Sequence, residues 1–193
     1  MLGFNSKQLM GVGIFLFMIF IGVPLAIGVT GRWDFYFTLT SVALLAIASA
    51  GVWLTFYIGR INIGQGAFAL IGAYVSAILV VKADWSFWIS LPAAGLFSAV
   101  VAILIGLPIL RLRGVYFAMI TLVLTQVVTL TALALPITNG ARGISNIPLP
   151  SGISVFGIPI LPDFAAMENT KLAFYYTACI IMLATYAALY RLV

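Results

Sequence analysis

Polar side chains that could bind or guide a solute interrupt this apolar sequence at three places. The first is GRINIGQG, residues 59–66, where the amides Asn62 and Gln65 lie among glycines that include Gly64 and Gly66. Glycine allows the backbone to leave a helix, and an amide there can pair with freed backbone groups or contact a polar solute. The alternative is a plain turn between two helices that an amide caps, and both interpretations remain open.

A second polar pattern follows one face of a later apolar segment. Thr121, Thr125 and Thr129 recur every four residues, and Gln126 lies next to them. A threonine in a membrane helix often donates to its own i−4 carbonyl, which is the plainer interpretation. The same stripe would suit an uncharged passage for a small zwitterion, because such a passage needs weak binding sites.

The third place is the run TNGARGISNIP, residues 138–148, at the start of a long connection. Its Asn-Gly pair and its further glycines are typical of an exposed, turn-rich loop.

The residues that are missing exclude other chemistry. Without histidine, the chain cannot form a Ser-His-Asp triad or a histidine metal site, and the single Cys179 cannot build a zinc site or a disulfide framework. The acids Asp34, Asp84, Asp163 and Glu168 all lie in connections, so no carboxylate at membrane depth marks an ion-driven carrier. We therefore predict no enzymatic activity, no metal site and no cofactor on this chain. Energy for transport would come from another subunit.

Composition fixes the fold class. Hydrophobic residues make up 64% of the chain and charged residues 7%, against about 25% in soluble domains. A spanning helix needs about 20 apolar residues. We predict an all-α, polytopic transmembrane bundle in one permease domain, with about six spans at residues 9–29, 35–58, 61–81, 87–110, 114–136 and 172–192.

The connections suggest an orientation. If the N-terminus is cytoplasmic, five of the nine cations face the cytoplasm and the loop at residues 137–171 faces outward, which agrees weakly with the positive-inside rule. The scattered cations form no basic face, so a nucleic-acid partner is not expected. Small residues at four-residue spacing, such as Ala69, Ala73 and Ala77 beside Gly72 and Ser76, predict close helix packing.

Three ordered segments carry a family resemblance. GRINIGQGAFALIGAY, residues 59–74, resembles the GxxxLGxxAFxxIGAY pattern of the branched-chain amino acid ABC transporter permeases. LPILRLRGVYFAMITLVLTQ, residues 107–126, resembles that family's LRLRGxYxAxxTL segment, and residues 138–148 resemble its TGGxNGxSGIP element. The resemblance covers residues 35–193, and it departs from the family at Asn139 and Arg142.

The matching positions suggest roles. The matches are Gly64, Gln65, Gly66 and Tyr74 in the first segment, Arg111, Arg113, Gly114 and Tyr116 in the second, and Gly140, Gly143, Ser145 and Pro148 in the outer loop. Combining residues and resemblance, we predict a substrate path along Asn62, Gln65, Thr121, Thr125 and Gln126. We predict structural or gating roles for Gly64, Gly66, Tyr74, Gly114 and Tyr116.

The resemblance implies a multi-pass subunit of an importer in the bacterial inner membrane. It implies a second, related permease, two cytoplasmic ATPase subunits that hold ATP and Mg²⁺, and a periplasmic substrate-binding protein. The implied solute is leucine, isoleucine, valine or a relative, although similar permeases carry urea or short amides. Family members continue past a helix end like residues 190–193, so we expect this chain to be incomplete relative to them and unable alone to couple ATP hydrolysis to transport.

Two other functions fit the residues. A passive channel or facilitator would move solute without nucleotide. A structural or assembly subunit would tolerate Gln65→Leu and Thr125→Val without loss of uptake.

Overall fold

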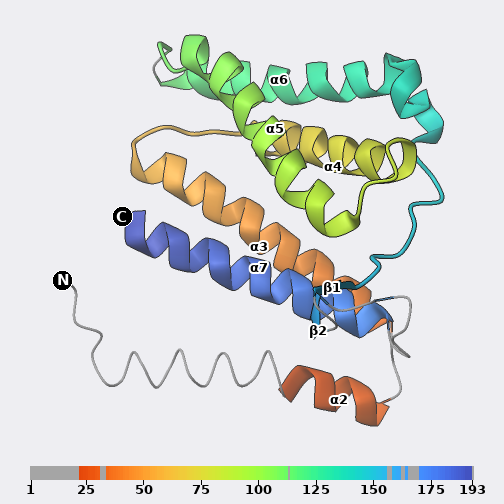
Figure 1. The fold of residues 1–193 in the computed structure, drawn as a ribbon. Coiled ribbons are helices and arrows are strands. Elements are labelled where there is room, and N and C mark those ends of the chain that lie inside the picture. Colours follow the sequence, from red (N-terminus) through yellow and green to blue (C-terminus); the bar gives the residue numbers. More distant parts are fainter. Residues whose placement is uncertain are drawn as a thin grey trace, which may run out of the picture. The chain divides into compact units, whose positions relative to one another are not determined.

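The computed structural model describes residues 22–30, 34–112, 114–155, 158–161, 164 and 170–192. Most of this is helix (Figure 1). The helices are α2 (Val23–Thr30), α3 (Phe35–Tyr57), α4 (Gln65–Lys82), α5 (Phe87–Ile109), α6 (Val115–Ala134) and α7 (Thr170–Leu192). Five of them, all but α2, are long and apolar enough to cross a membrane, which confirms the prediction of a polytopic helical membrane protein. Most of the predicted first span, residues 9–29, lies outside the described residues. Its last part, residues 22–29, is described and forms most of α2.

The start of α4 differs from the predicted span. The sequence suggested a helix from residue 61, but α4 begins at Gln65. The side-chain Oδ1 of Asn62 accepts a hydrogen bond from the Gly64 N–H at 2.8 Å. Such an Asx-type turn gives the backbone a local alternative to helical hydrogen bonds, so the helix starts one turn late.

The long connection after α6 contains short elements that an all-α prediction did not include. It begins with two 3₁₀ turns, η2 (Pro136–Thr138) and η3 (Gly140–Arg142). Further on, β1 (Ile153–Val155) pairs antiparallel with β2 (Ile158–Leu161) in a two-stranded ribbon. Segments of three and four residues are too short for hydrophobic periodicity to reveal them.

The helices pack into two compact units, and the boundary between the units falls within α3, after Ala46. In the first unit, α2, the first part of α3 and α7 enclose a small core of Ile27, Tyr36, Tyr175 and Cys179. The rings of Tyr36 and Tyr175 lie 5.8 Å apart. At the surface, Lys171 Nζ lies 2.7 Å from Asp34 Oδ1, and this hydrogen-bonded ion pair lowers the pKa of the Asp34 carboxyl.

In the second unit, α4 packs against α5 through small and hydroxyl-bearing residues. The Ser98 hydroxyl donates to the Phe68 carbonyl at 2.9 Å, and the hydroxyl oxygens of Ser76 and Ser90 lie 3.3 Å apart. The contacting face of α4 therefore carries Ser76 and Gly72, whereas Ala69 and Ala73 are exposed. Close packing through small residues is as predicted, but the alanine stripe is not the face that meets α5.

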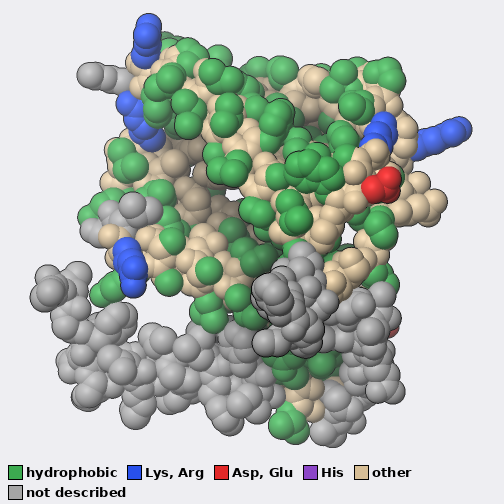
Figure 2. Space-filling model, in the orientation of Figure 1, with side chains coloured by type: hydrophobic (Ala, Val, Ile, Leu, Met, Phe, Trp, Pro, Cys, Tyr) green, Lys and Arg blue, Asp and Glu red, His purple; other side chains and the backbone are tan. Residues whose placement is uncertain are grey.

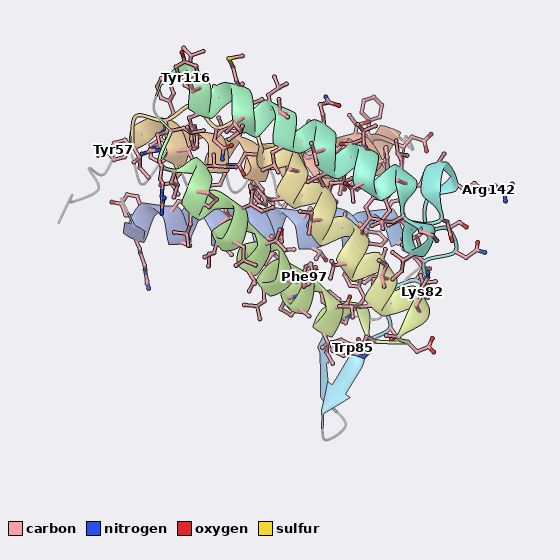
Figure 3. The ribbon with its side chains drawn as sticks, turned by 90° about the horizontal axis from the view of Figure 1, so that it is seen from above. Tyr57, Lys82, Trp85, Phe97, Tyr116 and Arg142 are labelled. Atoms are coloured by element: carbon pink, nitrogen blue, oxygen red, sulfur yellow. The ribbon has the colours of Figure 1, made fainter. Side chains whose placement is uncertain are left out.

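Hydrophobic side chains cover most of the outward faces of the helices, and Lys and Arg occupy a few positions (Figure 2). Figure 3 shows Tyr57 and Tyr116 at one end of the second unit's helices and Lys82, Trp85 and Arg142 at the other. The α3–α4 and α5–α6 connections thus share one end. The α4–α5 connection and the turn after α6 share the opposite end.

Candidate functional site

The segment between α3 and α4 interrupts regular helix within the second unit. The N–H groups of Ile58, Gly59 and Arg60 pair with carbonyls in the last turns of α3, and the last two N–H groups of the segment are paired by side chains. Asn62 accepts from the Gly64 N–H, and the Thr121 hydroxyl on α6 accepts from the Ile63 N–H at 3.2 Å. Thr121 is only 4% exposed. The segment is therefore held on α6 by a buried polar contact, because an unpaired N–H at this position would carry a desolvation cost.

Glycine permits this close approach. A Cβ added at Gly64 would lie 3.2 Å from the Thr121 carbonyl oxygen and 3.2 Å from the Thr121 Cβ, so a backbone atom that cannot move away would crowd it. At Gly66 an added Cβ would lie 3.5 Å from Thr125 Cγ2, which is an ordinary contact. The structure thus brings the predicted residues Asn62, Gly64 and Gly66 together with Thr121 and Thr125.

The threonine hydroxyls are largely used within α6. Thr121 donates to the Ala118 carbonyl at 2.9 Å, Thr125 donates to the Thr121 carbonyl at 3.2 Å, and Thr129 donates to the Thr125 carbonyl at 2.8 Å. The plainer interpretation of this stripe is therefore confirmed for Thr125 and Thr129. Their oxygens keep acceptor capacity, but their protons are engaged.

Gln65 differs from the threonines in having an unused amide. It is the first residue of α4 and is half-buried, and its side chain lies against Gly51 of α3. Within the described part of the chain, the amide makes no hydrogen bond. Its donor and acceptor groups are therefore free for another molecule. Gln126 is likewise free of hydrogen bonds to described residues, but it lies on an exposed face of α6.

Arg60 is the residue that sequence reasoning missed. From the α3–α4 segment, its Nη1 donates to the carbonyls of Leu110 at 2.6 Å and Leu112 at 3.1 Å, and its guanidinium lies 5.4 Å from the centre of the Phe117 ring. The carbonyls at a helix C-terminus lack helical donors and carry partial negative charge, so a cation is favoured there. In sequence Arg60 is only a cation between two spans, and nothing local signals partners 50 residues away.

The predicted gating residues are more dispersed. Gly114 has φ +59° and precedes α6, where its backbone angle favours glycine. Tyr116 is 74% exposed at the same end of the unit (Figure 3). Tyr74 is half-buried further along α4. Among the described residues, no hydrogen bond joins the side chain of Tyr74 or Tyr116 to the segment between α3 and α4.

The predicted outer-loop residues lie at the opposite end of α6, near Arg142 in Figure 3. Gly140 and Gly143 have φ +58° and +65°, and an added Cβ at Gly140 would lie 3.1 Å from the Leu133 carbonyl oxygen. These two glycines therefore shape the turn. Ser145 and Pro148 are exposed.

Side chains from α4 and α5 anchor this outer connection. Lys82 Nζ donates to the Ile137 carbonyl at 2.8 Å, and Trp88 Nε1 donates to the Ser151 carbonyl at 3.1 Å. The Trp88 ring also meets the buried Phe164 ring edge-on, with centroids 5.5 Å apart. The connection is thus attached to the ends of two spanning helices.

Comparison with known proteins places the chain in a family. The family model described as "Branched-chain amino acid transport system / permease component" matches residues 34–193, well over half of the sequence. This chain belongs to the branched-chain amino acid permease family. The polar segment between α3 and α4 (residues 58–64) and the outer turn after α6 (residues 136–143) both lie within the matched region. The description of the family is that of a transport-system permease component.

Two curated relatives are similar to part of this permease. Over 101 residues it is 44% identical to the high-affinity branched-chain amino acid transport system permease protein LivM of Salmonella typhimurium, and 43% identical to the protein of the same name from Escherichia coli K12. The alignments cover 52% of this chain and 23% of each relative, so the matched region spans about a quarter of the relatives' length. No solved structure matches the chain.

Proposed function

We propose that this chain is a membrane-spanning permease subunit of an ATP-driven importer and forms part of the path for branched-chain amino acids. The observation that carries the proposal is the late start of α4, which leaves the free amide of Gln65 beside a non-helical segment packed on α6. Substrate sites in transporters are often formed where a spanning helix is interrupted.

The length of α4 supports a position within the bilayer for this segment. Its 18 residues extend about 27 Å, slightly less than the roughly 30 Å hydrocarbon core. Residues 61–64 directly precede α4, and we place them at the edge of the hydrocarbon core. Non-helical backbone at that depth is tolerated where it is buried in protein or lines a water-filled cavity. The Thr121 contact provides burial on one side, and the Gln65 amide offers a polar surface.

The chemistry of the segment suits a small, mostly apolar zwitterion. Gln65 provides a donor and an acceptor without net charge, and most residues of α3 and α4 are hydrophobic. Passage requires that a solute bind weakly enough to leave. A neutral amide meets that need better than a buried charge, which would hold the carboxylate or ammonium group tightly.

The family implies the wider assembly. We propose a second, homologous permease subunit, two cytoplasmic ATPase subunits that bind ATP and Mg²⁺, and a periplasmic substrate-binding protein, all at the bacterial inner membrane with the N-terminus in the cytoplasm. An external energy source is consistent with the acids of the sequence, which all lie in predicted connections.

Uptake by the assembled transporter in liposomes tests this function. Labelled leucine should enter only with ATP and the binding protein, and a protonophore should have no effect. Gln65→Leu should reduce uptake about tenfold or more, because the loss of a hydrogen bond that a solute uses costs about 1.5 kcal/mol. Thr131→Val is the comparison, since it removes a polar group from an exposed position of α6 outside the predicted path.

Three results would contradict the proposal. Uptake without nucleotide would indicate a passive facilitator. Competition by urea or short amides, without competition by valine or isoleucine, would indicate the alternative substrate class. Normal uptake by the Gln65→Leu and Thr125→Val variants, with normal assembly, would indicate a structural subunit.

A further inference from the structure

We propose that Gly51, in the interior of α3, is a positioning residue for transport: the absence of a side chain there fixes where the Gln65 amide lies. This inference rests on the proposed function, because it concerns the amide that we place in the solute path. Neither the polar segments of the sequence nor the family motifs include Gly51.

The geometry is specific to the amide group. A Cβ added at Gly51 would lie 3.1 Å from Gln65 Oε1, 3.2 Å from Cδ and 3.2 Å from Nε2. Because these three atoms are nearly equidistant from one point, the amide turns its flat face toward Gly51. Each distance is shorter than an ordinary van der Waals contact of about 3.5–4.0 Å. A methyl group at Gly51 therefore requires the amide to move away by a few tenths of an ångström.

The contact also sets the depth of the amide. Gly51 lies six residues before α3 ends at Tyr57, which corresponds to about 9 Å along the helix axis. The amide is thus level with the second helical turn inside α3 rather than with its end. A glycine at this position weakens the helix by roughly 0.5–1 kcal/mol relative to alanine, so helix propensity does not explain it.

Unused hydrogen-bonding capacity links the position of the amide to transport. The flat face of the amide lies on Gly51, while its donors and acceptor have no partner among the described residues. A solute that uses these groups would meet them only in the orientation that Gly51 allows. Displacing the amide by even a few tenths of an ångström would weaken such hydrogen bonds, because their strength depends on distance and angle.

The test uses Gly51→Ala in the assembled transporter, with leucine uptake measured across leucine concentrations. We expect KM to rise about threefold to tenfold, the range typical of coupled neighbours, while the maximal rate and the amount of assembled protein change less than about twofold. Gly95→Ala is the matched control. Gly95 lies inside α5, and a Cβ added there would meet nothing within 4 Å.

Rescue separates positioning from a general loss of structure. Gln65→Asn shortens the side chain by one methylene, which makes room for a methyl group at Gly51. In the Gly51→Ala, Gln65→Asn double variant, we expect KM within about twofold of the Gln65→Asn single variant, so that the two changes are strongly non-additive. If Gly51→Ala acted only through helix packing, it would instead raise KM by the same factor in the wild type and in the Gln65→Asn variant.

The outcomes distinguish this inference from the proposed function. If wild-type protein imports leucine with ATP but Gly51→Ala behaves like Gly95→Ala, or the double variant shows additive losses, the inference is wrong and the function stands. If the wild type shows no ATP-driven uptake, both are overturned.

Discussion

After α6, Thr138 donates to the carbonyls of Ala132 and Leu135, a few residues behind it, whereas before α4 the Ile63 N–H reaches Thr121, 58 residues further along the chain. Both breaks are rich in glycine and both lie in the second unit. The outer turn satisfies most of its backbone locally, with one long-range donor from Lys82 to the Ile137 carbonyl, and the segment before α4 satisfies part of its backbone through another helix. A turn of the first kind depends on its own sequence, and a segment of the second kind depends on the packing of the bundle.

Local chemistry accounts for the outer turn in detail. The Ala132 carbonyl would normally accept from the N–H of the residue four positions on, but that residue is Pro136, which has no N–H. The Thr138 hydroxyl supplies the missing donor. Asn139 and Gly140 then adopt positive φ, which asparagine and glycine tolerate better than other residues. Local residues therefore supply most of the hydrogen bonds of the outer turn, and Lys82 of α4 adds one at the Ile137 carbonyl.

Gly64→Val should have the largest effect on stability, and it tests the segment before α4, which packs on α6. A single Cβ added at Gly64 would already lie only 3.2 Å from the Thr121 carbonyl oxygen, and the larger valine side chain would crowd it further. The segment must therefore move away from α6. We expect a loss of about 3 kcal/mol in the free energy of unfolding, the upper range for overpacking. Chemical unfolding of the whole chain in detergent measures it.

Gly66→Ala serves as the control for this change, because its Cβ would make an ordinary contact with Thr125. A loss at Gly66 as large as the loss at Gly64 would show that the tight approach to Thr121 is not the cause.

Thr121→Val should have the next largest effect. It keeps the shape of the side chain but leaves the Ile63 N–H without its acceptor, which costs about 2 kcal/mol for a buried donor. Thr121→Ser retains the hydroxyl and should lose far less. Thr125→Val removes a hydroxyl that donates only within α6, and it should be nearly neutral in the same unfolding measurement. Equal losses for Thr121→Val and Thr125→Val would remove the contrast between the two breaks.

The sequence predicted what depends on composition and local chemistry. Uninterrupted apolar runs gave the spanning helices, and the Asn-Gly run after residue 138 indicated the turn. One of the two interpretations of Thr125 and Thr129, donation to carbonyls of their own helix, also followed from the sequence, because threonine commonly does this in membrane helices. Each of these features depends on residues within one or two helical turns of one another.

Long-range contacts could not be predicted in the same way. Nothing near Arg60 indicates that its guanidinium reaches the end of α5, and nothing near Gly51 indicates that the Gln65 amide rests on it. The sequence also did not indicate which face of α4 meets α5, because Ala73 and Ser76 are both small and only packing chooses between them. The candidate site therefore combines a predictable list of polar residues with a geometry that the sequence does not encode locally.

Gly140→Ala tests the outer turn. A non-glycine residue at φ +58° costs about 1–2 kcal/mol, and the added Cβ would approach the Leu133 carbonyl oxygen. The loss should be confined to the outer turn, so hydrogen exchange should increase at residues 136–143 and stay unchanged at residues 60–66. Gly140→Asn should be milder, because asparagine tolerates this backbone region. Exchange that increases equally at both breaks would show that they are not independent.

Arg60→Met should have the smallest effect of the four on stability, and it tests whether the α3–α4 segment has one anchor or two. Methionine keeps an apolar stem over Phe117 but removes the donors to Leu110 and Leu112. We expect a loss of about 1 kcal/mol, since water can reach part of the guanidinium and replace its hydrogen bonds. Arg111→Met removes an exposed cation at the same end of the unit and should change stability less. Combined with Thr121→Val, Arg60→Met should cost more than the sum of the single losses if each contact holds the segment when the other is absent. Strict additivity would show that the two contacts fix separate parts of the backbone, and that the Thr121 contact alone attaches the polar segment to α6.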